Sequence, residues 1–171
     1  GFDLDADFAG VHPRAFVDSF PEGIWSGRVR ATGSPESYAV RGRFASRQSW
    51  WGPVDGTGSV NVTGGRWTFE RLDLAVPGSP MRAVAEGTLE PVGNGLVADL
   101  AASWTALTWP TVPPPDQAWS SPTGRARLRG PLDHYRVVAD GDLAVVRMPR
   151  STWHVEGEGD PRGFEIARAL S

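Results

Sequence analysis

Val54 to Val62, with the sequence VDGTGSVNV, shows most clearly how this chain folds. Valine or glycine occupies every even position of this stretch, and a polar side chain occupies every odd one. Successive side chains of a β-strand point to opposite faces, so the alternation predicts a strand with one apolar and one polar face. The same period of two recurs in stretches that begin at Phe2, Trp25, Tyr38, Trp67, Met81, Leu96, Gly124, Tyr135, Trp153 and Phe164. About ten or eleven short strands joined by turns predict an all-β fold, a repetitive antiparallel meander.

The alternation changes register once within a strand. Trp67 and Phe69 are odd-numbered, whereas Leu72 and Leu74 are even-numbered, and Glu70-Arg71 lies between the two pairs. A slip of one residue would turn every later side chain to the opposite face. The sequence therefore predicts a β-bulge at Glu70-Arg71, which keeps both pairs on one face.

Two segments depart from the strand pattern. Residues 13–20 (PRAFVDSF) begin with a proline and place Phe16, Val17 and Phe20 at helical spacing, which predicts one short helix near the N-terminus. Residues 108–122 contain five prolines. Proline cannot donate a hydrogen bond to a central ladder, so we expect an extended loop over 108–122.

A weak internal repeat indicates how the strands are organised. The stretch Gly27-Arg28-Val29-Arg30 recurs as Gly124-Arg125-Ala126-Arg127, and Tyr38 recurs at the same offset as Tyr135. We therefore expect two related units, residues 24–104 and an incomplete unit at 121–171. A repeat that stops before its second unit ends predicts that residues 1–171 are a single segment of a larger, solenoid-like array.

Composition excludes several classes of protein. The formal net charge is −3, and all 17 residues counted as lysine or arginine are arginine. No basic excess favours a nucleic-acid partner, and the absence of cysteine excludes disulfides and cysteine metal sites. No apolar run reaches the roughly 18 residues that a membrane-spanning helix needs. We expect the targeting segment of an exported parent protein to lie outside these residues.

No arrangement of residues favours catalysis or a metal site. The histidines, His12, His134 and His154, are far apart in the sequence, and we expect them at the surface or in loops. Asp3, Asp5 and Asp7 are possible calcium ligands, but alternation already places them on the polar face. The same applies to the acids of 140–142 and 156–160, which could otherwise suggest a glycosidase pair. We expect no enzyme activity, no cofactor and no metal.

Arginines form rows on the polar face. The members are Arg28, Arg30, Arg41, Arg43, Arg125, Arg127 and Arg129. Such rows can bind anionic headgroups or acidic polymers. They can also do no more than pair with acids across strands and keep a sheet face soluble, which is the more common arrangement.

The apolar face is the candidate functional site. It mixes many glycine and alanine residues with a few large side chains, so a second sheet at the usual spacing of about 10 Å would leave volume unfilled. An acyl chain could occupy that volume. The alternative is that the aromatic side chains fold over the glycines and complete an ordinary sandwich core. The residues that we expect to face lipid are Trp25, Val29, Tyr38, Val40, Phe44, Val60, Val62, Trp67, Phe69, Leu72, Leu74, Met81, Ala83, Ala85, Leu89, Leu96, Ala98, Leu100, Leu128, Tyr135, Val137, Leu143, Trp153 and Val155.

Several of these motifs are similar to those of the TamB family of envelope proteins. The stretch from Gly58 to Leu74, continued by residues 81–89, resembles that family's recurring core, and so do residues 107–110, 124–130 and 133–137. The resemblance covers most of the chain from about Ile24 onward and rests on loose, apolar motifs. It implies a curved, taco-shaped open β-sheet with an apolar interior, in a periplasmic protein anchored in the inner membrane. It also implies two partners, phospholipid and a TamA-like barrel of the outer membrane, and no catalytic residues.

Three functions follow from these patterns. The first is a segment of a periplasm-spanning groove that conducts phospholipid from the inner to the outer membrane. The second is a chaperone or scaffold segment that assists outer-membrane protein assembly by strand pairing. The third and weakest is a sandwich that binds carbohydrate through Trp50-Trp51 or Trp119. Open sheet edges also predict edge-to-edge self-association of the isolated chain.

Overall fold

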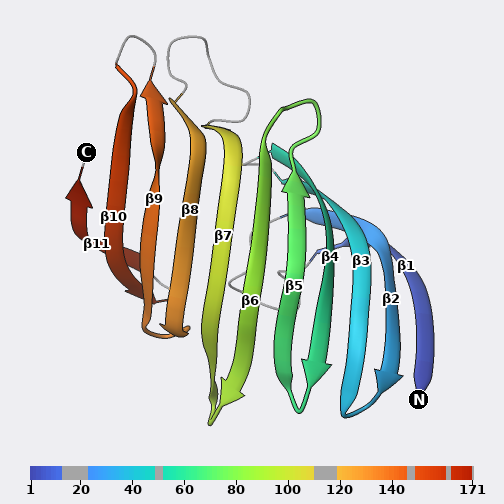
Figure 1. The fold of residues 1–171 in the computed structure, drawn as a ribbon. Coiled ribbons are helices and arrows are strands. Elements are labelled where there is room, and N and C mark those ends of the chain that lie inside the picture. The colour runs from blue at the N-terminus through green and yellow to red at the C-terminus, as the bar shows by residue number, and fades with distance from the viewer. Residues whose placement is uncertain (13–22, 49–51, 110–118, 146–148, 161–162, 171) are drawn as a thin grey trace.

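A computed structural model describes residues 1–12, 23–48, 52–109, 119–145, 149–160 and 163–170. These residues form one eleven-stranded sheet in which the strands follow one another in sequence order, and each pairs antiparallel with the next. Figure 1 shows the strands side by side from β1 to β11, with the two termini on opposite edges of the sheet. The all-β antiparallel meander is thereby confirmed.

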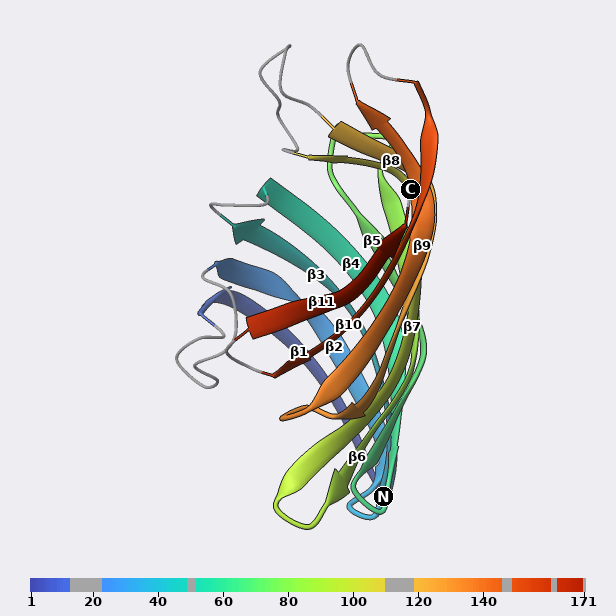
Figure 2. The same ribbon diagram turned by 90° about the vertical axis from the view of Figure 1, so that its left-hand side faces the viewer.

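The strands are long enough to form extended ladders. They are β1 (Phe2–Val11), β2 (Ile24–Ser34), β3 (Ser37–Gln48), β4 (Gly52–Thr63), β5 (Arg66–Ala75), β6 (Arg82–Val92), β7 (Gly95–Trp109), β8 (Trp119–Pro131), β9 (Tyr135–Val145), β10 (Ser151–Asp160) and β11 (Gly163–Leu170). Figure 2 views the sheet from the side, where it is an open and curved single layer. The predicted helix at 13–20 lies outside the described residues.

Tight hairpins account for the regular meander. Thr63 pairs with Arg66 across a two-residue turn made of Gly64 and Gly65, whose φ angles are 57° and 83°. A hairpin turn with positive φ at both central residues matches the twist of the flanking strands, and glycine adopts that conformation without steric cost. The turn therefore sets the register of β4 against β5.

The bulge predicted in β5 is confirmed. Ser59 pairs with Arg71 and Val60 pairs with Phe69, which leaves Glu70 as the extra residue. The Glu70 carboxylate accepts hydrogen bonds from Ser59 Oγ at 3.0 Å and from Asn61 Nδ2 at 2.7 Å. These bonds hold the bulge against β4, so Phe69 and Leu72 lie on the same face of the sheet.

The strands extend further into the proline-rich segment than we predicted. Thr108 belongs to β7, and residues 119–122 belong to β8, so the ends of the expected loop at 108–122 are wrong. Pro122 is compatible with β8 because the β8–β9 ladder shifts register between Ser120 and Gly124, where its missing N–H costs no regular bond. Residues 110–118 lie outside the described part of the chain.

Candidate functional site

One row of apolar side chains crosses the whole sheet. Directly paired residues of neighbouring antiparallel strands point to the same face. The register connects Leu4, Ala31, Val40, Val60, Phe69, Gly87, Leu100, Leu128, Val137, Gly157 and Ile166, one from each strand. No member of this row is polar. We call the face that contains it the apolar face, and the opposite side the polar face.

The strand register places almost all of the predicted groove residues on the apolar face. Each either belongs to the row above or lies an even number of residues from it along its own strand, with the β5 bulge taken into account. Met81 is the exception, because it precedes β6 and has no partner in the ladder. Most of these side chains are half-buried, whereas Trp67 and Leu96 are exposed and Val62 and Ala98 are buried.

Aromatic side chains cover several glycines of the apolar face. The Phe44 ring occupies the space beside Gly56, and the Trp104 ring occupies the space beside Gly124. Tyr135 lies over Gly159 in the same way, where an added Cβ would come within 2.7 Å of its ring. The aromatics therefore do fold over the glycines, but they do so within one sheet. Among the described residues there is no second sheet that would complete a sandwich core.

Two tryptophans, one on β7 and one on β10, contact each other across the two strands that lie between them. Trp104, Gly124, Gly141 and Trp153 are paired in one row, and the two indole rings meet above the glycines with centroids 6.1 Å apart and an interplanar angle of 17°. Trp104 Nε1 donates to Ser121 Oγ at 2.9 Å, which satisfies its polar atom. Trp104 was not among the predicted groove residues. Its position in the alternation of residues 96–104 was the signal that could have identified it.

An apolar depression lies over β1 to β5. Its volume is about 260 Å³. The large apolar side chains that line it are Phe8, Trp25, Val29, Val40, Phe44, Val60, Phe69 and Leu72. Trp25 and Phe44 stack at 4.8 Å and form one wall. Elsewhere on the face, large side chains are open to solvent, such as Leu4 at 54% and Trp67 at 47% exposure. This surface can accept a hydrocarbon guest without displacing a packed layer.

The polar face is held together by ion pairs. Arg28 forms a bidentate ion pair with Asp5, in which Nε and Nη2 each donate to one carboxylate oxygen at 2.7 Å. Arg30 forms the same bidentate pair with Asp3. These bonds lower the pKa of both aspartates, with the hydrogen bond to arginine as the largest cause. The Asp3–Asp5–Asp7 ladder thus serves at least in part to neutralise β2. In the part of the chain that the structure describes, no group of three or more acids and histidines is arranged to hold a metal ion.

We expected His154 at the surface or in a loop, and it lies in strand β10. Its Nδ1 lies 2.7 Å from Asp140 Oδ1 on β9, and its Nε2 lies 3.1 Å from Glu156 Oε1. Hydrogen bonds to these two carboxylates raise the pKa of His154, Asp140 being the larger cause. Arg125 and Arg136 approach the same two acids from β8 and β9. When it is protonated, the imidazole can donate to both carboxylates, and its bond to Asp140 links β9 to β10.

We expect the free energy of unfolding to fall as the pH rises above the ordinary histidine value of 6.5. Below that value His154 is protonated in both states, so its contribution is fully present, and it is lost as the pH rises through the higher pKa of the folded state. Urea denaturation across this range measures the effect, and His154→Gln should remove it. His134→Gln is the matched control, since that side chain is 76% exposed and lies 3.6 Å from Glu158. A pH dependence unchanged in His154→Gln would contradict this assignment.

Comparison of the chain with protein-family models, with curated protein sequences and with solved structures gives no match. Among the described residues, no helix is long and apolar enough to cross a membrane. The function is therefore inferred from the chemistry of the two faces.

Proposed function

We propose that the apolar face binds the acyl chains of phospholipids, as one segment of a taco-shaped, periplasm-spanning β-groove. The observation that supports this most directly is the uninterrupted apolar row from Leu4 on β1 to Ile166 on β11. It lies on a single-layer sheet whose described residues provide no protein layer to cover it. Such a face needs a cover in water, and acyl chains match its chemistry.

The energetic argument favours a continuous surface. Exposing one methylene group to water costs about 0.8 kcal/mol, so a chain of about sixteen carbons costs on the order of 12 kcal/mol. A row that crosses every strand lets the lipid remain in contact with protein as it moves from strand to strand. The surface lowers the barrier but supplies no direction, so net flow requires a sink or an energy source elsewhere.

The proposal includes the setting that the family resemblance implies. The complete protein would be anchored in the inner membrane, lie in the periplasm, and deliver phospholipid to the outer membrane at a TamA-like barrel. This segment would only need to align its apolar face with the apolar faces of the adjoining segments of the groove. The ion-paired polar face would then remain in the aqueous periplasm.

The choice of test residue follows from the packing. Gly87 is unsuitable, since its φ is 138° and any Cβ would overlap the backbone of Asp99. Val60 is half-buried, lines the apolar depression and pairs with Val40 on β3 and Phe69 on β5. Ile24 on β2 is the matched control, because it is an apolar side chain, 50% exposed, adjacent in the strand to Trp25 and therefore on the opposite face.

We expect the purified wild-type chain to carry phospholipid that mass spectrometry detects. Val60→Asp should reduce the bound lipid by more than about tenfold, because a carboxylate in an apolar contact costs well over 1.4 kcal/mol. Ile24→Asp should retain the lipid. Circular dichroism checks that both variants fold. If Val60→Asp does not fold, Leu96→Asp provides a second test, because Leu96 is 44% exposed. Equal lipid loss in Ile24→Asp, or no lipid on the wild type, would overturn the proposal.

A second candidate function is supported by the open edges of the sheet. In the described residues β1 and β11 each pair on one side only, and an unpaired edge can receive an incoming strand. A chaperone or scaffold for outer-membrane protein assembly would use these edges and would also allow self-association. It should bind an unfolded outer-membrane protein and tolerate Val60→Asp, which the lipid conduit does not.

A further inference from the structure

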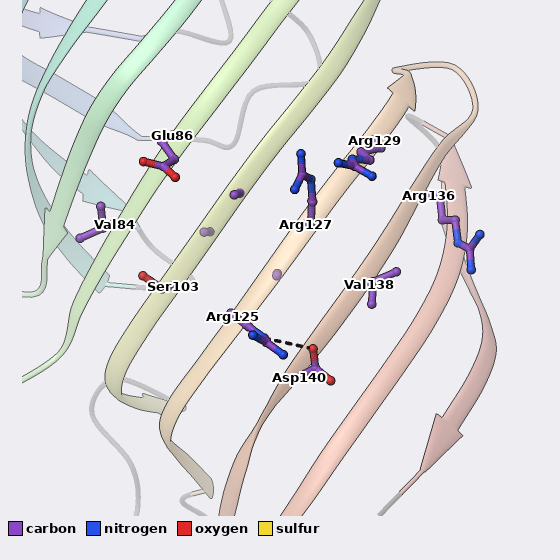
Figure 3. A pocket seen from close by; sticks show the side chains of 12 residues that line it. Val84, Glu86, Ser103, Arg125, Arg127, Arg129, Arg136, Val138 and Asp140 are labelled. Carbon is purple, nitrogen blue, oxygen red and sulfur yellow. Dashed lines mark hydrogen bonds and ion pairs between the residues drawn. The ribbon is translucent and has the colours of Figure 1, made fainter.

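A hollow of about 680 Å³ lies on the polar face, over β6 to β9. Figure 3 shows it from close by, with arginines projecting from β8 and β9. Its floor contains small or apolar side chains, Val84, Ala101 and Val138. The hollow is on the side of the sheet opposite the proposed lipid surface and is independent of it.

The internal repeat shows why the hollow forms here. Arg127 is the counterpart of Arg30 and lies opposite Ala101, whereas Arg30 lies opposite Asp5. Arg125 is the counterpart of Arg28 and lies opposite Ser103, whereas Arg28 lies opposite Asp7. The position of Thr32 is taken by a further arginine, Arg129. Against the strand before it, the second unit therefore keeps the arginine column, adds one cation and loses two carboxylates, whereas on the other side Asp140 takes the place of Arg43.

The remaining acids do not satisfy these arginines. Arg127 binds both oxygens of Asp99 at 2.9 Å, so Arg129 has only a 3.3 Å contact to the same carboxylate. Arg129 also lies directly opposite Arg136, a like-charge pair. The Arg129 side chain is 60% exposed, so it is free to reach an incoming group.

Arg125 is in the same situation. It reaches Asp140 at 3.4 Å, but His154 already holds that carboxylate at 2.7 Å. Its side chain is 79% exposed. Across the floor, Glu86 on β6 faces the hollow and opposes the binding of an anion. Arg125 and Arg129 thus offer donors that the neighbouring acids engage only weakly.

We propose that this hollow binds a phosphate group, with Arg129 as its principal donor. The planar guanidinium presents paired N–H groups that match the oxygens of a phosphate. The Val84–Ala101–Val138 floor accommodates the carbon skeleton to which the phosphate is attached. Soluble phosphate esters and the headgroups of anionic phospholipids share this chemistry.

The test uses inorganic pyrophosphate as the soluble probe, titrated calorimetrically at low ionic strength, where screening is weak. Arg129→Gln should weaken binding by about tenfold, since it removes a charge-assisted pair. Ala101→Asp restores the carboxylate that Asp5 provides in the first unit, and it should abolish binding. Glu86→Gln should tighten binding. Arg30→Gln, in the neutralised column of β2, is the matched control and should leave binding unchanged.

A second arm identifies the source of the phosphate. If the site takes lipid headgroups, vesicles containing phosphatidylglycerol should bind the wild type more tightly than Arg129→Gln, whose apolar face is unchanged. If it takes soluble esters, only pyrophosphate should show that difference. The proposal is overturned if neither probe binds the wild type, or if Arg30→Gln weakens binding as much as Arg129→Gln. Neither result depends on whether the apolar face carries lipid.

Discussion

Replacing Ala98 with aspartate should unfold this protein or destabilise it by about 3–5 kcal/mol, the cost of a buried charge without a partner. Ala98 is 1% exposed and lies between Leu89 on β6 and Gly130 on β8. At 1% exposure a carboxylate there would be shielded from water, and neither of its paired neighbours is a cation. Since whole domains are stable by only about 5–15 kcal/mol, the loss is a large fraction of the total. Urea denaturation followed by circular dichroism measures it.

Ala101→Asp is the matched control for this prediction. Ala101 lies on the same strand, three residues away, but it faces the polar side and pairs with Arg127. We expect its stability to stay within about 0.5 kcal/mol of the wild type, as for surface positions in general. Equal destabilisation by the two substitutions would show that β7 does not separate an apolar from a polar face, and the assignment of faces would be wrong.

Gly124→Val should destabilise the sheet by about 1–3 kcal/mol, the usual cost of forcing extra atoms into a filled site. A side chain at Gly124 would overlap the Trp104 ring. That ring is held by its hydrogen bond to Ser121 and by its stack with Trp153, so it cannot move aside without losing both. The near-ultraviolet circular dichroism of the tryptophans should change together with the unfolding midpoint.

Gly163→Ala provides the comparison for that substitution. It also lies in a strand, β11, but no atom lies within 4 Å of the Cβ that it would gain. We expect no loss of stability and no change in the tryptophan signal. If Gly124→Val were equally harmless, the aromatic rings would not be packed against the glycines, and the face would be more open than the structure shows.

The periodic features of the fold could be predicted residue by residue. The alternation around Val60 indicated a strand, and the change of parity between Phe69 and Leu72 indicated the bulge that Glu70 forms. Both are local properties, because the direction of a side chain along a strand depends only on its position. The ends of the proline-rich loop could not be predicted in this way. Pro122 is accommodated where the ladder between β8 and β9 shifts register, which the local sequence does not reveal.

The partners of the charged groups were also beyond prediction. The arginine rows were evident in the sequence, and acids were expected opposite them. Which acid each arginine reaches depends on diagonal contacts between strands, as in the bond from Arg127 to Asp99. His154 acquires two carboxylate partners only when β9 and β10 are in register.

By itself, the order of residues determined that this chain forms a two-faced antiparallel sheet and which side chains share each face, because a period of two acts within every strand. Only the tertiary structure decided how those faces are used. In its described part the apolar face has no covering sheet, aromatic rings fill the glycine positions, and arginines near Ala101 are left with shared carboxylates. These features arise from contacts between residues far apart in the chain, and such contacts depend on register and packing, which the alternation of side chains does not specify.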